Sequence, residues 1–340
     1  MKYLKKFEDH SGYAEFVSGG TMVKPNVSYC DEEMEVHFNP FGYRCSYFTI
    51  VAREAGTITF KSDSALTSDY FSYIEYSIDD GITWTKNDKA DNVELVVNVQ
   101  VSEGDKVIWR GVNACLSYLD LPNFAAYSHF TSDCEVDVEG NIMSLLYGDD
   151  FANKKSLSGQ SGVFCGLFNT SENSYLRIVD ASHLVLQATK LCKFCYSAMF
   201  AYCQTLVNAP SLPALKLEEF CYTSMFMNCT SLVNPPEVSA TVLADNCCGS
   251  MFWGCTSLTS SPELKATSVD DVNFPYGGMF NGCTSLTSIT CYIVGESLNA
   301  VWGLENVPSN GTFTKSASAT WSTGPNGIPE GWTVVDKQIA

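Results

Sequence analysis

Cysteine is the residue type in this sequence with the widest chemistry, because a thiolate can bind zinc, form a disulfide or attack a substrate. The chain has 15 cysteines, an odd number that cannot all pair within one chain. Its single CxxC motif, Cys192-Lys193-Phe194-Cys195, lacks the second pair or nearby histidines that a zinc site needs. Many cysteines, Cys195 and Cys247-Cys248 among them, instead follow an internal repeat. We therefore predict packed free thiols, no metal, no cofactor and a reducing compartment.

Carboxylates alternate along one predicted strand, where Asp133, Glu135, Asp137 and Glu139 share a face. Calcium prefers such oxygen-rich surfaces, but no glycine-punctuated ligand loop accompanies these four. We expect a solvated face and leave calcium binding open. The four histidines are scattered over the chain and form no constellation with carboxylates, so the sequence predicts a protein that is not an enzyme.

Residues 77–84 read Ser-Ile-Asp-Asp-Gly-Ile-Thr-Trp and match the S-x-D-x-G-x-T-W pattern of an Asp box, which is found in sialidase-like propellers and other β domains. In such a box the polar side chains bond the backbone of a turn, and tryptophan packs beneath it. A sialidase would need several boxes and three arginines at one site. We predict a structural hairpin, and a carbohydrate-active enzyme is a third hypothesis that depends on this box alone.

The overall charge narrows the class of partner. Lys and Arg total 20 against 38 Asp and Glu, which gives a formal net charge of −18 at pH 7. The negative electrostatic field of such a chain disfavours binding to nucleic acid and to anionic lipid. No apolar run reaches the roughly 18–20 residues of a membrane span, so we expect no membrane insertion. The charged N-terminus, Met1–His10, lacks the apolar region of a signal peptide, and we expect no secretory export.

The elements that must position these groups come from an internal repeat of Met-Phe-x-x-Cys-x-x-Leu, whose methionines lie 26, 26 and 28 residues apart. Counted from methionine, the Met, Phe, Cys and Leu residues occupy offsets 0, +1, +4 and +7. This spacing predicts an apolar stripe on a short helix, which an extended Leu-x-x-x-Pro-x-Leu segment follows. One such coil cannot bury its stripe alone, so coils should stack and equivalent residues form ladders. The predicted structural ladder consists of Met199, Met225, Met251, Met279, Phe200, Phe226, Phe252, Phe280, Cys203, Cys229, Cys255 and Cys283.

Other repeat positions are candidates for a binding surface. Offsets +2 and +3 vary among copies, and tyrosine stands three residues before three of the methionines. Tyrosine and tryptophan suit protein or sugar recognition, because they give large contact areas at low entropic cost. An equally good interpretation packs the tyrosines between coils. The predicted exposed repeat face consists of Tyr196, Tyr202, Tyr222, Asn228, Trp253, Tyr276 and Asn281.

The repeat unit Met-Phe-x-x-Cys-x-Ser-Leu-x-x-x-Pro-x-Leu resembles the BspA-type leucine-rich repeat family over residues 140–300. The flanks around residues 140–148 and 311–332 are similar to segments that frame such repeats in proteins of gut bacteria and their phages. Residues 4–8, 25–30 and 35–38 resemble a leader of virion-associated proteins of such phages. The resemblance implies adhesins and binding surfaces without a shared catalytic residue.

Together these patterns predict an α/β-type leucine-rich-repeat solenoid preceded by a small all-β sandwich, for which the period-two segments of residues 42–118 provide the strands. We assign residues 1–41 to an N-terminal attachment segment and 119–160 to a linker and solenoid N-cap. The repeats occupy residues 161–300, and a C-terminal cap occupies 301–340.

The expected function is that of a non-enzymatic virion structural protein, a tail or head fibre component made in the bacterial cytoplasm. The N-terminal region would contact other virion proteins, and the repeats would contact a host-surface glycan or protein. We expect a homo-oligomer. The alternative is a bacterial cell-surface adhesin of the BspA type, located on the bacterial cell surface.

Overall fold

The structure is a computed structural model that describes residues 3–6, 13–16, 22–23, 46–120, 124–157, 159, 161–171, 174–269, 272–294, 303–304, 306–324 and 327–338. In the N-terminal part, strands β1 (Tyr3–Lys6), β2 (Tyr13–Phe16) and β3 (Met22–Val23) form one antiparallel sheet. Most of the predicted leader, including residues 25–30 and 35–38, lies outside the described residues.

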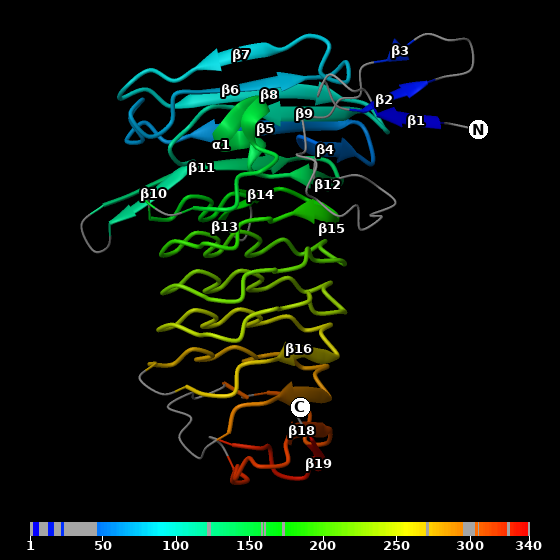
Figure 1. Ribbon diagram of the computed structural model, residues 1–340, viewed down its shortest axis with the longest axis vertical. Helices are drawn as coiled ribbons and strands as arrows, with labels where there is room; N and C mark the ends of the chain where they lie inside the picture. Colours follow the sequence, from blue (N-terminus) through cyan, green and yellow to red (C-terminus); the bar gives the residue numbers. More distant parts are fainter. Residues whose placement is uncertain are drawn as a thin grey trace.

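Two sheets form a β-sandwich at one end of the molecule (Figure 1). The four-stranded sheet has the order β10-β11-β5-β8, and the six-stranded sheet the order β15-β12-β4-β9-β6-β7. All neighbours pair antiparallel except β12 and β15, which run parallel. The strands are β4 (Phe48–Ala52), β5 (Gly56–Ser62), β6 (Tyr73–Ser77), β7 (Thr85–Asp88), β8 (Leu95–Val101), β9 (Lys106–Arg110), β10 (Ser117–Asp120), β11 (Phe124–Ser132), β12 (Val136–Asn141) and β15 (Ile178–Val185).

The sandwich core is aromatic, and its rings come from both sheets. Trp109 of β9 meets Phe130 of β11 edge-on at 5.0 Å between centroids, and Phe60 of β5 lies 4.9 Å from Phe130. All three side chains are fully buried. Such tilted aromatic pairs contribute about 0.5–1.5 kcal/mol beyond their area burial, so this cluster holds the two sheets face to face.

Strand β12 joins the sandwich to the rest of the chain. It lies between β4, with which it pairs antiparallel, and β15, with which it pairs parallel. The prediction of a linker and solenoid N-cap over residues 119–160 is therefore wrong, because β11 and β12 are interior strands of the two sheets. After β12 come a single helical turn, α1 (Ser144–Tyr147), and the 3₁₀ turn η2 (Gly148–Asp150).

Below the sandwich, the described residues between positions 161 and 338 form a column of stacked coils (Figure 1). Its first coil contains the short hairpin of β13 (Asn169–Ser171) and β14 (Ser174–Tyr175). Parallel bridges such as Leu212–Val238 and Lys216–Val242 link successive coils. Further along, β16 (Ser260–Leu264), β17 (Ser288–Cys291), β18 (Thr312–Ser316) and β19 (Thr333–Lys337) form a parallel sheet in sequence order. The stack thus continues through the region predicted as a cap, because β18 and β19 add two further strands to the sheet.

The predicted fold class, an α/β-type leucine-rich-repeat solenoid, is wrong. In the part of the chain that the structure describes, α1 is the only α-helix, and the repeat segment forms consecutive turns instead of helices. In the coil of residues 220–229, even-numbered N–H groups donate to the next coil, such as Phe226 N–H to the Met251 carbonyl at 2.9 Å. Odd-numbered N–H groups donate to the carbonyl three residues before, such as Cys229 to Phe226 at 3.1 Å. A helix would use every interior N–H within the segment, so bonding between coils excludes it.

The turns require a left-handed backbone at every fourth residue. Phe220, Ser224 and Asn228 have φ of 56°, 55° and 59°. At the repeat offset of Asn228, the four copies carry Tyr202, Asn228, Gly254 and Gly282, all with positive φ. Glycine and asparagine tolerate this conformation best. The variation at this offset, which the sequence suggested to be free, therefore meets a backbone requirement.

Candidate functional site

The predicted ladder residues form the dry interior of the column. All twelve methionine, phenylalanine and cysteine side chains are fully buried. The Phe226 and Phe252 rings stack at 5.6 Å with 6° between their planes, and the Phe252 and Phe280 rings at 5.9 Å with 3°. The line of rings continues through Phe200 and Phe168 to Phe48 of the sandwich. The sandwich and the column therefore share one continuous core.

The ladder thiols are structural donors. Cys229, Cys255 and Cys283 each donate from Sγ to the phenylalanine carbonyl of the preceding coil, at 3.1, 3.0 and 3.0 Å. Burial raises the pKa of Cys203, Cys229 and Cys255, and it raises that of Cys283 to about 12. At neutral pH these groups are thiols, which are poor nucleophiles and poor metal ligands.

The other cysteines have similar surroundings. Every cysteine in the described part of the chain is free and buried. In the CxxC motif, a hydrogen bond from the Cys195 thiol lowers the pKa of Cys192, whereas burial raises the pKa of Cys195. Among the described residues, no group of three or more histidine, cysteine or acidic side chains could hold a metal ion.

The predicted exposed repeat face does not form as expected. Tyr196, Tyr222 and Tyr276 are at most 2% exposed. The turns direct both methionine and the residue three before it inward, so the tyrosines stack between coils, with Tyr196 and Tyr222 at 6.0 Å. The prediction that these three are exposed is wrong. Of the remaining four, Trp253 is 45% exposed, and Tyr202, Asn228 and Asn281 are half-buried.

Threonines line the column surface in two rows. Thr256 and Thr284 each point a hydroxyl at the carbonyl of the equivalent threonine one coil earlier, at 3.5 Å. In the second row, Thr259 and Thr287 do the same towards Val233 and Thr259, also at 3.5 Å. These hydroxyls bond the backbone between coils, so they hold the column together more than they offer hydrogen bonds to a ligand.

The Asp box forms a hairpin turn between β6 and β7. Asp79 accepts from the Thr83 backbone at 2.9 Å and from its hydroxyl at 2.6 Å, and Trp84 Nε1 donates to the Gly81 carbonyl at 3.1 Å. These bonds lower the pKa of Asp79 to about 2. The Arg110 guanidinium lies 3.8 Å above the Trp84 ring. The side chains of the box thus bond the turn itself.

The acidic face of β12 and the preceding turn is paired with cations. Asp137 meets Arg53 at 2.7 Å, Glu139 meets Lys106 at 2.7 Å, and Glu135 lies 3.5 Å from Arg177. Asp133 instead accepts from the Thr57 backbone N–H at 2.6 Å. Because each of these carboxylates already faces a donor, the row is not an open cation surface.

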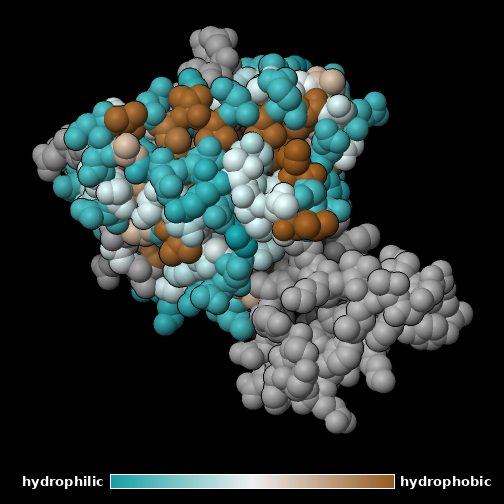
Figure 2. Space-filling model, turned by 90° about the horizontal axis from the view of Figure 1, so that it is seen from above, coloured by the Kyte–Doolittle hydropathy of each residue, from teal (hydrophilic) through white to brown (hydrophobic). Residues whose placement is uncertain are grey.

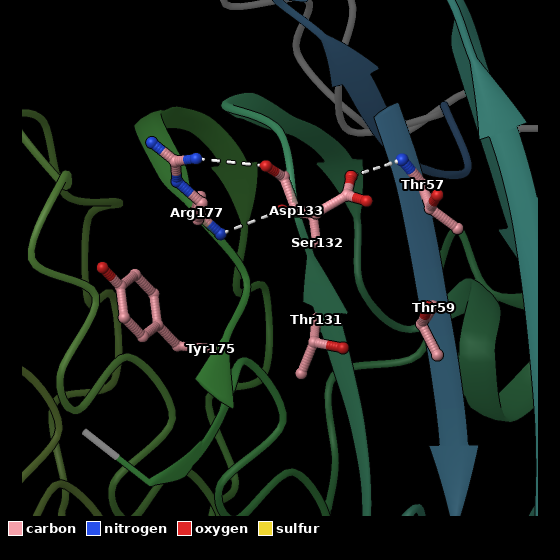
Figure 3. Close-up of a pocket in the computed structure, with 7 residues that line it drawn as sticks. All are labelled: Thr57, Thr59, Thr131, Ser132, Asp133, Tyr175 and Arg177. Atoms are coloured by element: carbon pink, nitrogen blue, oxygen red, sulfur yellow. Dashed lines mark hydrogen bonds between the residues drawn. The ribbon is translucent and has the colours of Figure 1, made fainter. Parts of the chain in front are cut away.

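A polar hollow lies where the outer face of the four-stranded sheet meets the first coil (Figure 3). We call it the seam hollow. Its volume is about 350 Å³. It is lined by Thr57, Thr59, Thr131, Ser132, Asp133, Tyr175 and Arg177. Tyr175 stands on one side, and Thr59 and Thr131 stand on the other (Figure 3).

Close backbone approach and hydrogen bonds fix the upper end of the seam hollow. The Arg177 backbone N–H donates to Ser132 Oγ at 3.1 Å, and Arg177 Nη1 donates to the Asp133 carbonyl at 3.1 Å. Gly56 leaves room for Asp133, because a Cβ there would lie 2.5 Å from Asp133 Oδ1 and from Cys134 Cβ. The arginine and the carboxylate are therefore held in place before any ligand arrives.

A second hollow of about 720 Å³ follows along β11 and is lined in part by Asp63, Tyr127, His129 and Asn169. His129 and Thr131 are alternate residues on one face of β11, and Asn169 pairs with Tyr175 across the β13–β14 hairpin. The two hollows are therefore neighbours, and we call them together the seam. Burial lowers the pKa of His129 to about 4, so its ring is neutral at pH 7.

Sequence reasoning did not find the seam. Asp133 was noted only in the acidic row, and no motif contained the other lining residues, Thr57, Thr59, Thr131, Ser132, Tyr175 and Arg177. The one local signal is the alternation of polar residues, Thr57 and Thr59 in β5 and His129 and Thr131 in β11, which puts polar side chains on the outer face of each strand.

No family model, curated protein or solved structure matches this chain. In the described ranges, no helix has the length and hydropathy required to cross a bilayer.

Proposed function

We propose that this chain is a non-enzymatic attachment protein of a virion, a tail or head fibre component that presents a binding surface to the host. The observation that carries the proposal is the shared strand β12, which hydrogen-bonds to the sandwich through β4 and to the column through β15. Because one sheet continues from the sandwich into the column, no flexible linker separates the two regions. An elongated body of this kind transmits orientation and force, as attachment requires.

The continuous core supports the same proposal. The stacked rings from Phe48 to Phe280 and the bonds between coils make the column one body along its length. Each coil contacts only its neighbours, so length is gained by repetition at nearly constant cost per coil. Such a body is stiff along its whole length, as a fibre component must be.

The sandwich end is our choice for the contact with the carrier. Ile78 and Ile82 of the Asp-box hairpin are 67% and 81% exposed, and Val93 and Val112 are 56% and 53% exposed. Figure 2 looks onto this end of the molecule and shows hydrophobic residues in several patches between hydrophilic ones. Exposed apolar side chains in patches are typical of protein contact surfaces.

The virion setting depends on the resemblance of the leader to virion-associated proteins, and the test addresses it directly. Lysates of the bacteria that carry the gene are separated on a density gradient, and antibodies against this chain locate it. Co-sedimentation with phage particles, with gold label on their fibres, is the expected result. Recovery with the cell envelope would favour a bacterial surface adhesin, and recovery only as a free protein would overturn attachment altogether.

A further inference from the structure

The seam hollow presents polar groups that the fold leaves unused. Within the described residues, the hydroxyls of Tyr175 and Thr131 have no hydrogen-bond partner, and Asp133 uses Oδ1 but not Oδ2. Arg177 has Nε to spare, because its bond to the Asp133 carbonyl comes from Nη1. The four residues that carry these two hydroxyls, this carboxylate oxygen and this guanidinium N–H all line the seam hollow. These groups both donate and accept.

The charges of the seam exclude two classes of ligand. Among the residues that line the two hollows, Arg177 is the one cation, and Asp133, Asp63 and Glu94 are acidic. Lys61 of β5 lies opposite His129, whose ring is neutral. The chain as a whole carries −18. An anionic ligand would meet a repulsive field. A metal cation in the seam hollow would face the Arg177 guanidinium and a carboxylate already bonded to Thr57. A neutral ligand remains.

The shape of the hollow favours a ligand with one apolar face and a polar edge. The half-buried Tyr175 ring stands on one side of the hollow together with Arg177, and Asp133 and the threonines stand on the other (Figure 3). An aromatic ring gives a flat apolar contact with little entropy to lose, and a few placed polar groups fix orientation. A pyranose matches both, since its C–H face is apolar and its adjacent hydroxyls donate and accept. The Asp133 carboxylate can accept from one sugar hydroxyl, and the Arg177 guanidinium can donate to another.

The second hollow gives such a ligand room to continue. It lies next to the first along β11, and Asn169 Oδ1 there is a buried acceptor without a partner in the described part of the chain. A single sugar would fill one hollow, whereas a chain of sugars would lie along β11 from Tyr175 towards His129.

We propose that the seam binds a neutral oligosaccharide, with one sugar ring against Tyr175 and its hydroxyls bonded to Asp133, Arg177 and Thr131. This assignment rests on the proposed attachment function and names the ligand class and the place of contact. The contact then lies beside the sandwich, at the first coil, and not on the repeat face along the column.

The test measures binding of neutral trisaccharides of glucose, galactose, mannose and N-acetylglucosamine to the full chain by saturation-transfer difference NMR and calorimetry, with sialyllactose as the acidic comparison. We expect at least one neutral trisaccharide to bind and sialyllactose not to bind. Tyr175→Ala should weaken binding about tenfold. Thr131→Val, which keeps the side-chain shape, should weaken it roughly threefold.

Two further variants make the result specific to the seam. Tyr175→Phe keeps the ring, so it should bind within a few-fold of the parent even if Tyr175→Ala unfolds. Trp253→Ala on the exposed column surface should bind as the parent does. Absence of binding by every neutral probe, or equal loss in Trp253→Ala and Tyr175→Ala, would overturn the assignment.

A cell-binding assay separates this assignment from the proposed function. Labelled full-length chain is incubated with candidate host cells and counted by flow cytometry. Binding that Tyr175→Ala abolishes and the trisaccharide inhibits supports both. Cell binding that is unaffected by both the Tyr175→Ala substitution and the trisaccharide would refute the sugar site at the seam but not the attachment function. A chain that binds the trisaccharide but no cells would refute attachment and leave the seam standing.

Discussion

The sandwich and the column solve the same packing problem in different ways. In the sandwich, each core ring has unlike neighbours at unlike angles, as where Trp109 meets Phe130 at 73° and Phe60 meets Trp109 at 38°. In the column, each ring meets its own equivalent one coil away, nearly parallel, as between Phe252 and Phe280. The sandwich is therefore bound by contacts among distant segments, and the column by one contact repeated.

This difference predicts how far the structural effect of a destabilising core substitution extends in each region. A substitution in the sandwich core removes contacts from both sheets at once, because each core ring packs against both sheets. A substitution in the column ladder removes contacts only from the two neighbouring coils, since stability in stacked repeats is a sum of unit and nearest-neighbour terms. We therefore expect a core substitution to destabilise the whole sandwich, and a ladder substitution to destabilise only the neighbouring coils of the column.

The largest expected effect comes from removing one fully buried ring in each region. Phe130→Ala and Phe226→Ala should each cost about 3–5 kcal/mol of unfolding free energy, the usual range for such truncations. Hydrogen exchange with mass spectrometry should show faster exchange in β4, β5, β9 and β11 for Phe130→Ala. For Phe226→Ala, faster exchange should be confined to the coils around residues 199–206, 225–232 and 251–258. Equal spread in both variants would contradict the comparison.

A smaller effect should follow from the left-handed turn positions, which only the column repeats. Gly282 has φ of 76°, and a Cβ there would meet its nearest atom at 3.6 Å, an ordinary contact. Gly282→Ala should therefore cost only the backbone strain, about 1–2 kcal/mol in a urea titration. Asn228→Gly, at the same offset in another coil, is the matched control and should cost less than the alanine change. A cost-free Gly282→Ala would show that the turns do not need this backbone.

The pH dependence should arise at the seam and not inside the column. The folded pKa of His129 is about 4, below the unfolded value of about 6.5, because burial disfavours the charged ring. Between pH 4 and pH 6.5 the unfolded chain therefore binds more protons than the folded chain. The contribution of neutral His129 to the free energy of unfolding is complete above pH 6.5 and is lost as the pH falls towards 4. We expect a loss on the order of 2 kcal/mol, since the ring is only half-buried.

Chemical denaturation at several pH values measures this loss. His129→Gln should flatten the stability curve between pH 4 and 6.5, whereas replacing the exposed His183 by glutamine serves as the control. An unchanged slope in His129→Gln would place the pH dependence elsewhere.

The smallest effect concerns reactivity and leaves stability unchanged. At pH 8 iodoacetamide should leave the ladder cysteines and Cys291 of the native column unmodified, because burial raises the pKa of these thiols, that of Cys283 and Cys291 to about 12. Cys192 should react first among the described cysteines, since its pKa is lowered and it is the most exposed of them, at 8%. Peptide mass spectrometry after timed alkylation gives the order. Early modification of Cys229 or Cys255 would show that the column interior is open.

Much of the column was predictable from the sequence, and little of the seam was. The spacing of Met225, Met251 and Met279 identifies equivalent residues one coil apart, so the buried ladder follows from counting. The tyrosines three residues before methionine were assigned to the wrong side, because the same spacing fits a helix and a series of turns. Asn228, Gly254 and Gly282 at one offset were the available signal for left-handed turns.

The seam could not be predicted because its residues come from unrelated parts of the chain. Thr57 of β5, Asp133 after β11 and Arg177 after β14 are far apart in sequence and are brought together by sheet pairing and by the first coil. No periodicity relates them, so their proximity depends on strand order and register.

The sequence by itself determined which residues repeat and therefore which side chains meet their own kind, because a fixed period fixes the neighbour. The tertiary structure decided whether the repeat is helical and where polar groups converge. The reason is physical: backbone N–H groups must find acceptors, and in this chain half of those in the repeat turns find them in the next coil, which no single repeat contains.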